Sequence, residues 1–100
     1  MSQQKNNEAL WGELNSQTAR IQWSELQRYF AKGLVVSVAP DLDLVDIAIK
    51  LVQDNAGEIG PMIAEGMVVR ATDDHARKWT DRDPELWAVV VAPWVLVQER

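Results

Sequence analysis

Residues 87–98 have the sequence WAVVVAPWVLVQ, and the rest of the domain must be arranged around them. From Val89 to Gln98 the chain carries no charge, and Gln98 is the only polar side chain. The many β-branched residues favour strand over helix. Pro93 is compatible with a sheet edge, a bulge or a turn between two short strands. Because a half-exposed strand would alternate apolar and polar residues, both faces of this strand must be covered.

Two arrangements could bury both faces of this strand. In the first, helices at about 8–18 and 44–55 of the same chain sandwich the segment as a central strand. In the second, another copy of the protein or a different protein packs against it, which would also protect an apolar edge strand from aggregation. The interaction surface would then consist of Trp87, Pro93, Trp94 and Gln98. Trp94 would be its anchor, because large aromatic rings dominate binding hot spots.

Two further strands are expected at 34–38 and 67–71, where β-branched residues cluster. Each follows a glycine, Gly33 or Gly66, that we expect to end a helix in the left-handed conformation. Both segments share the pattern Ala-x-Gly-x-Val-Val. A duplicated helix–strand–helix unit would explain this similarity, and so would the ordinary construction of a βα protein. We predict that the two strands are neighbours in one sheet.

Helical periodicity and capping residues account for much of the remaining chain. Ser24 and Gln27 form a capping-box pattern, and Asp43 and Thr72 can each cap a later helix. Helices are expected at about 8–18, 24–32, 44–55, from Gly57 or Pro61 to Gly66, and 73–80. We therefore predict an α+β fold in which a small sheet of about three strands packs with about four or five helices. This single domain would cover residues 8–100, after a flexible N-terminal tail at 1–7.

Composition limits what this domain can be. The chain has 100 residues, 47% of them hydrophobic and 25% charged, which is typical of one globular domain. The absence of cysteine excludes disulfides, thiolate metal sites and a cysteine nucleophile. Without a long apolar stretch or a signal peptide, a cytoplasmic protein is expected. The net charge of −5 disfavours nucleic acid and anionic membranes as partners.

The single histidine, His75, belongs to a charged cluster at the start of the last helix. It follows Asp73 and Asp74, and three successive helical side chains diverge too much to chelate one ion together. Asp73 stands four residues before Arg77, and Asp74 four residues before Lys78. We therefore expect two ion pairs on a solvated helix face rather than a metal or acid–base site.

Two other clusters have equally simple explanations. The Asp-x-Asp-x-x-Asp motif that begins at Asp41 is explained by a turn and a helix cap, without the glycine and later glutamate of a calcium loop. Arg20, Arg28 and Lys32 could bind phosphate, although a solvated face is simpler in an acidic chain. There is no glycine-rich phosphate loop and no Gly-x-Ser-x-Gly motif. We predict no catalytic, cofactor or metal site.

Three segments carry a resemblance to a known family: LWGELN at 10–15, IQWSELQRYFAKG at 21–33 and LWAVVVAPWVLVQE at 86–99. They are similar to the small bacterial family catalogued as domain of unknown function 2288. The ending APWVLVQ is the most specific part, and the resemblance covers nearly the whole chain after the N-terminal residues. It implies a short stand-alone bacterial protein, and it carries no functional residue over to this sequence.

Function is therefore predicted only as a class. The first hypothesis is a non-catalytic protein-interaction or regulatory domain, either a homo-oligomer or bound to another protein. The alternative is a small-molecule or metal-binding protein or enzyme with a pocket of carboxylates and tryptophan rings. A nucleic-acid-associated protein is a third class, whose binding would weaken as salt rises.

Overall fold

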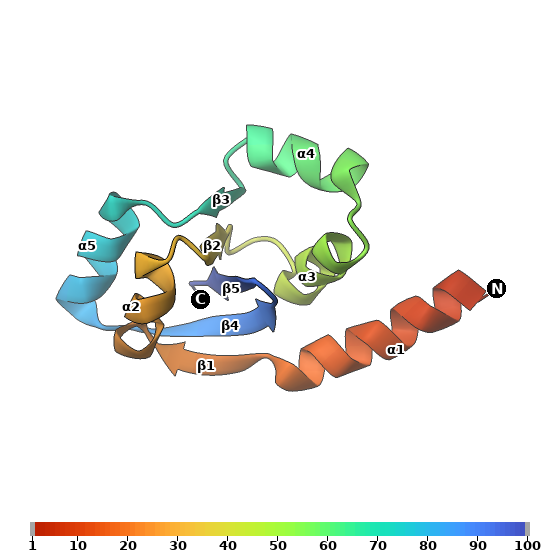
Figure 1. Ribbon diagram of the computed structural model, residues 1–100, viewed down its shortest axis with the longest axis horizontal. Coiled ribbons are helices and arrows are strands. Elements are labelled where there is room, and N and C mark those ends of the chain that lie inside the picture. The colour runs from red at the N-terminus through yellow and green to blue at the C-terminus, as the bar shows by residue number, and fades with distance from the viewer. Residues whose placement is uncertain (1, 100) are drawn as a thin grey trace.

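The structure, a computed structural model, describes the backbone of residues 2–99 and the side chains of residues 9–99 (Figure 1). It confirms an α+β domain. In chain order the elements are α1 (Ser2–Gln17), β1 (Ala19–Gln22), α2 (Trp23–Ala31), β2 (Val35–Val38), α3 (Leu44–Val52), α4 (Ala56–Ala64), β3 (Val68–Arg70), α5 (Asp73–Arg82), β4 (Glu85–Val91) and β5 (Trp94–Gln98). The first helix begins at Ser2 rather than near Glu8, so residues expected as a tail are helical. No helix within residues 2–99 has the length and apolarity needed to cross a membrane.

The sheet has five strands instead of about three, in the order β1-β4-β5-β2-β3. β5 is parallel to β2, and the other neighbouring pairs are antiparallel. The stretch 87–98 lies in the hairpin of β4 and β5, so Pro93 occupies a turn between two strands, one of the three expected positions. The strand that the sequence did not reveal is β1, because its four residues, ARIQ, are mostly exposed and lack the β-branched clustering of the other strands.

The expected neighbouring pair is confirmed, since β2 and β3 form an antiparallel ladder. Gly33 follows the end of α2 with a φ of 73°, and Gly66 follows the end of α4 with a φ of 77°. Both glycines thus adopt the left-handed conformation that residues with a Cβ avoid. Duplication of the helix–strand–helix unit stays a hypothesis.

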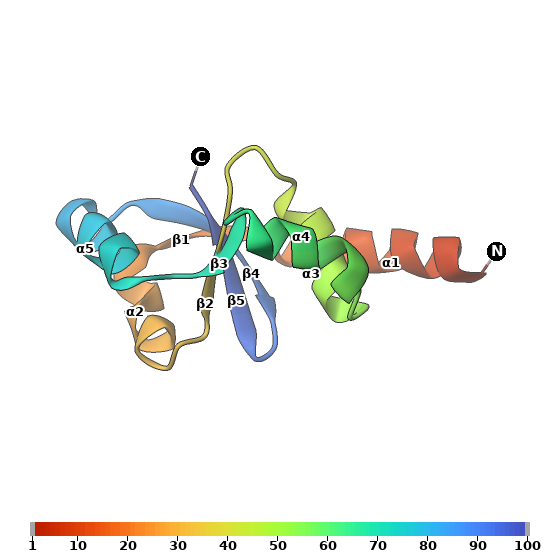
Figure 2. The same cartoon turned by 90° about the horizontal axis from the view of Figure 1, so that it is seen from above.

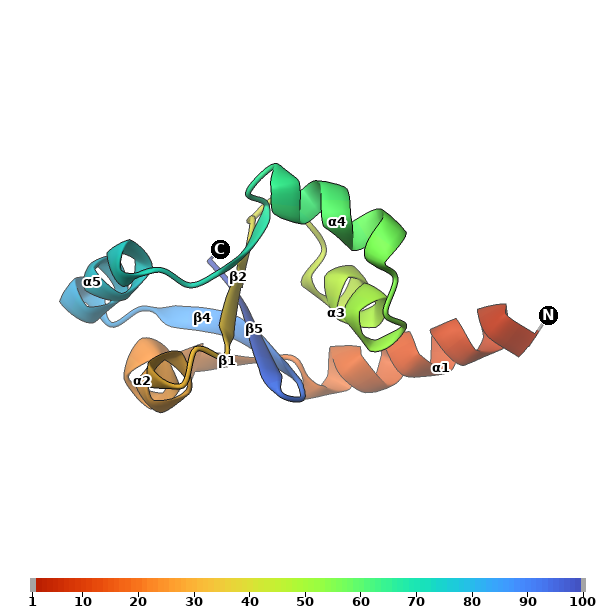
Figure 3. The same cartoon turned by 45° about the horizontal axis from the view of Figure 1, so that its top comes forward.

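Helices of the same chain cover both faces of the sheet (Figures 2 and 3). α1, α3 and α4 pack on one face, where Leu96 of β5 is completely buried, and α2 and α5 pack on the other, where Val97 is completely buried. β5 is therefore a central strand. The expected helices at 8–18 and 44–55 do contribute cover, but they lie on the same face, and α2 and α5 supply the opposite layer.

Helix capping follows the sequence at one helix and departs from it at another. The Asp43 carboxylate accepts hydrogen bonds from two backbone N–H groups of α3, as expected. Ser24 does not cap α2 with its side chain; its backbone N–H donates to Oδ1 of Asp83 at 2.9 Å. The N–H of Trp23 donates to the Pro84 carbonyl at 3.0 Å. Because β1 pairs with β4, the residues that precede β4 lie against the start of α2 and replace the local cap.

Gln98 was expected on an interaction surface, and this prediction is wrong. Its side chain is completely buried. Its amide Nε2 donates to the carbonyls of Ala39 at 2.8 Å and Leu42 at 2.6 Å. The last residue of β5 therefore holds the loop that leads into α3, and its polarity serves the core rather than a partner.

We expect Gln98→Leu to lower the free energy of unfolding by about 1 to 3 kcal/mol, because it removes two buried hydrogen bonds, and of their two carbonyl acceptors that of Ala39 keeps the Leu42 backbone N–H as a donor. Urea unfolding followed by tryptophan fluorescence measures this change. Gln27→Leu, at an exposed position of α2, is the matched control and should stay within about 0.5 kcal/mol of the wild type. An equally small effect for Gln98→Leu would contradict the anchoring role.

Candidate functional site

β3 forms one edge of the sheet and, among the described strands, is paired with β2 alone. In an antiparallel ladder, successive residues direct their backbone N–H and C=O groups alternately toward the partner and away from it. The Ala71 N–H donates to the Val35 carbonyl at 2.9 Å, so Val69 faces β2 as well. Val68 and Arg70 therefore direct their backbone polar groups to the open edge, where no further strand of the described residues pairs with β3. In Figure 1, α4 and α5 lie to either side of this strand.

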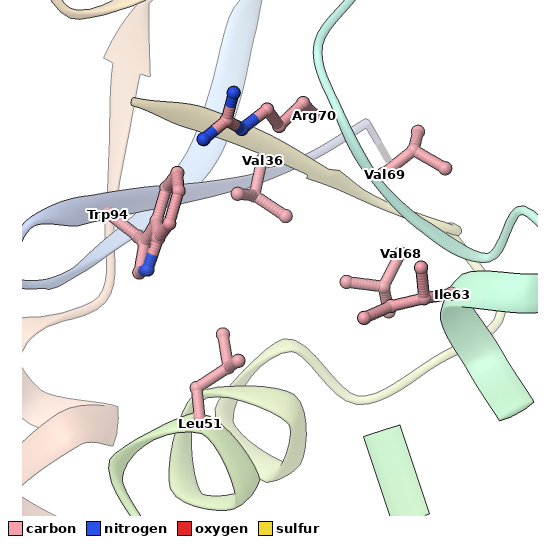
Figure 4. A pocket seen from close by; sticks show the side chains of 7 residues that line it. All are labelled: Val36, Leu51, Ile63, Val68, Val69, Arg70 and Trp94. Carbon is pink, nitrogen blue, oxygen red and sulfur yellow. The ribbon is translucent and has the colours of Figure 1, made fainter. Parts of the chain in front are cut away.

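An apolar groove of about 370 Å³ lies beside this edge (Figure 4). Its lining comes from β2, β3 and β5 and from α3 and α4, and consists of Val36, Leu51, Ile63, Val68, Val69, Arg70 and Trp94. We call it the Trp94 groove. It exists because α4 buries only Ile59 and does not close the face of the sheet. Ile63, on the same helix, leaves 51% of its surface exposed.

Arg70 is the single charged residue in the lining of the Trp94 groove. Its guanidinium carbon lies 5.1 Å from the centre of the Trp94 ring, a cation–π contact. Among the residues that the structure describes, Arg70 has no carboxylate partner. The groove thus combines an apolar lining with one unpaired cation.

A second hollow, of about 260 Å³, lies on the opposite face of the same edge, between β2, β3 and α5. The polar side chains in its lining are those of Ser37, His75, Lys78 and Glu99. We call it the His75 pocket. The two hollows differ in chemistry, since one is apolar and the other offers hydroxyl, imidazole and charged groups.

The His75 ring has a defined structural role. Its Nδ1 accepts a hydrogen bond from the Thr72 backbone N–H at 2.9 Å, and the backbone N–H of His75 donates to Oγ1 of Thr72 at 3.3 Å, which completes a capping box at the start of α5. The ring also stacks on Trp79, with 5.2 Å between ring centres. Because Nδ1 is an acceptor in this arrangement, the neutral ring carries its proton on Nε2.

Glu99 connects α5 with the end of the sheet. Its carboxylate accepts a hydrogen bond from the Trp79 indole and pairs with Lys78 at 3.3 Å. Burial, the largest single influence, would raise the pKa of Glu99, but the hydrogen bonds from Trp79 and Lys78, with the electrostatic attraction of Lys78 and His75, together outweigh it. The pKa of Glu99 is consequently lowered, and the carboxylate is ionised at neutral pH.

The two ion pairs predicted for α5 are wrong in detail. Arg77 pairs with Asp74 at 3.3 Å rather than with Asp73, and Lys78 pairs with Glu99 rather than with Asp74. The reason is tertiary, because the end of β5 brings a carboxylate beside α5. The Asp74 and Arg77 side chains are largely exposed, as expected for a solvated helix face.

The residues predicted as one interaction surface lie in different environments. Trp94 is half-buried in the Trp94 groove, and Pro93 is exposed in the adjoining turn. Trp87 is half-buried elsewhere on the sheet, beneath the Arg20 guanidinium, and Gln98 is in the core. Of the four, only Trp94 therefore belongs to the site.

Sequence reasoning missed most of the groove. Arg70 had a weak signal, because a cation closes an otherwise apolar predicted strand. Leu51 and Ile63 had none, since each is an ordinary apolar residue of a helix. Only the packing of α3 and α4 against the sheet places these two side chains beside Trp94.

Two aspartates of the Asp-x-Asp-x-x-Asp motif, Asp43 and Asp46, have structural roles. Asp43 caps α3, and Asp46 forms an ion pair with Lys50, whose pKa is raised chiefly by this hydrogen bond. In the part of the chain that the structure describes, no group of acidic and histidine side chains is arranged to hold a metal ion.

The basic residues Arg20 and Arg28 each lie over an aromatic ring. The guanidinium of Arg20 is 5.0 Å from the centre of the Trp87 ring, and that of Arg28 is 4.8 Å from the centre of the Tyr29 ring. Both cations are thus used in local packing on separate elements. A phosphate site shared with Lys32, the less simple of the two interpretations, stays a hypothesis.

Fold and site together define a class: a small α+β domain with a mixed five-stranded sheet and an open edge strand beside an apolar groove. The family model described as "Protein of unknown function (DUF2288)" matches residues 9–99. The chain belongs to this family, as its sequence segments indicated. No curated protein matches the chain.

A solved structure is similar to this chain over most of its length. It is described as "NMR solution structure of PA1075 from Pseudomonas Aeruginosa" and is 42% identical in sequence, with a TM-score of 0.81. The match covers 92% of this chain and 85% of that chain. The α+β fold is therefore shared by the two proteins.

Hydrogen exchange of the free protein tests the open edge of β3. We expect the Val69 and Ala71 amides to exchange slowly, because they are bonded to β2, and the Val68 and Arg70 amides to exchange quickly. NMR spectra recorded after transfer to deuterated water resolve the four amides. Equal protection of all four would show that another segment or a second molecule covers the edge.

Glu99→Gln tests the carboxylate that joins α5 to the sheet. Because the folded-state pKa lies below the ordinary value of 4.5, ionised Glu99 stabilises the fold above that pH, and the contribution is lost as pH falls through the lowered pKa. We expect Glu99→Gln to lower the free energy of unfolding by less than about 1 kcal/mol near pH 7, since the side chain is partly exposed. Urea unfolding should show this difference vanish in acid.

Glu65→Gln is the control, at an exposed glutamate with no ion pair among the described residues. It should leave stability unchanged at both pH values. A stability loss for Glu99→Gln that persists in acid would contradict the electrostatic explanation.

Proposed function

We propose that this domain is a non-catalytic protein-interaction domain that binds an extended segment of a partner as an added strand on β3. The observation that carries the proposal is the open edge of β3, where Val68 and Arg70 offer backbone N–H and C=O groups between two hollows of different chemistry. Strand addition of this kind draws affinity from main-chain hydrogen bonds and specificity from pockets for alternate side chains.

The two hollows suit an added strand because they lie on opposite faces of the same edge. Successive side chains of a strand point to opposite faces of the sheet. One set of partner side chains would therefore lie beside the Trp94 groove, and the other set beside the His75 pocket. This arrangement favours a segment that alternates apolar and hydrogen-bonding residues.

Small-molecule binding is the second candidate, and the Trp94 groove supports it. Its volume of about 370 Å³ is within the range of ligand pockets. The charged group beside Trp94 is an arginine, whereas the sequence suggested a pocket of carboxylates and tryptophan rings. The open edge strand nevertheless favours an extended peptide, because a small molecule would not use the backbone groups of Val68 and Arg70.

Selection from a displayed random peptide library, followed by hydrogen exchange, tests strand addition. With the best peptide bound, the Val68 and Arg70 amides should become protected, while Val69, already bonded to β2, should change little. A peptide that binds without protecting these two amides would refute the proposal. Protection that depends on protein concentration, with dimers seen in sedimentation, would instead show that two copies pair through β3.

A further inference from the structure

We propose that the segment bound on β3 is the C-terminal end of a partner chain, with its last apolar side chain in the Trp94 groove and its terminal carboxylate on Arg70. This inference rests on the proposed strand addition and names the chemical groups of the partner that would bind at the groove. It is drawn from the juxtaposition of an open strand edge, an apolar groove and an unpaired guanidinium.

The groove favours an apolar side chain. Six of its seven lining residues are apolar, and the charged one lies over the Trp94 ring. The exposed part of Ile63 extends the apolar surface toward solvent. A large aliphatic or aromatic side chain placed here would remove this surface from water, which is the main driving force for such contacts.

Charge complementarity points to a carboxylate at the same place. The lining of the groove contains no acidic residue, and Lys50, on the adjacent helix α3, is already paired with Asp46 and Glu58. Within the described residues, Arg70 is thus left as a cation without an ion-pair partner, in a chain whose net charge is −5. A guanidinium stacked on an aromatic ring can still form two parallel hydrogen bonds to a carboxylate through its edge.

Strand geometry favours a terminal carboxylate over an acidic side chain. Neighbouring side chains of a strand point to opposite faces, so an internal acidic residue next to the apolar one would point away from the groove. At a C-terminus, the carboxylate and the last side chain are attached to the same Cα. Arg70 can pair with the backbone of the added strand and also bind its terminal carboxylate. Its backbone lies on the open edge, and its side chain lies at the groove.

A matched pair of peptides tests the inference. A library of peptides displayed with free C-termini is selected on the protein, and the best binder is synthesised with a free carboxylate and with a C-terminal amide. We expect selected sequences to end in a large apolar residue. Fluorescence anisotropy should give a dissociation constant about tenfold to hundredfold higher for the amide, the usual effect of losing charged hydrogen bonds.

Two pairs of variants locate the effect on the protein. Arg70→Gln should remove the preference for the free carboxylate, whereas Arg77→Gln, at an exposed arginine of α5, should retain it. Ile63→Ser should weaken both peptides, whereas Val52→Ser should not, because Val52 is similarly exposed but does not line the groove. Urea unfolding verifies that all four variants are folded.

The results separate this inference from the proposed function. If Val68 and Arg70 become protected but acid and amide bind equally, or Arg70→Gln keeps the preference, the carboxylate inference is wrong and strand addition stands. If no peptide is enriched, or bound peptide leaves these amides unprotected, both are wrong. Competition by N-acetyl-leucine as strong as that of the whole peptide would show that the groove takes a small carboxylic acid without strand pairing.

Discussion

The whole domain depends on burying one strand, β5, on both of its faces. Leu96 and Val97 point to opposite layers and are completely buried. This requirement places β4 and β2 on either side of β5, with helices above and below the sheet. Even the single polar side chain of the strand serves the core, because Gln98 holds the loop before α3 with two hydrogen bonds. A charged residue at any of these positions would lack a partner in the interior.

The candidate site lies at the edge of the sheet that the helices do not fully cover. Helices pack most completely over the centre of the sheet, and α4 contributes only Ile59 to the buried core. The β2–β3 edge is consequently left with a hollow on each face, and Trp94, at the start of β5, is left half-buried. An added strand would complete the sheet there without rearranging the core, and rigid partners lose less entropy on binding.

The helix layer of α2 and α5, on the other face of the sheet from the Trp94 groove, holds the β2–β3 edge in place. Trp79 is buried in α5, stacks on His75 and donates to Glu99 at the end of β5. These contacts fasten the helix that borders the His75 pocket to the strand that carries Trp94. The similarity to a solved structure over most of the chain indicates that the two proteins share the backbone arrangement of this framework. The chemistry of the site, by contrast, depends on individual side chains such as Arg70.

Local sequence alone was enough for the features whose causes lie within a few residues. The left-handed turns at Gly33 and Gly66, the Asp43 cap and the β-branched strands were all predicted correctly. The cap of α2, the partner of Lys78 and the strand β1 depend on segments distant in the sequence, so only the tertiary structure decided them. The Trp94 groove is the extreme case, because five elements must meet before Arg70, an unremarkable strand residue in the sequence, becomes an unpaired cation beside an apolar hollow.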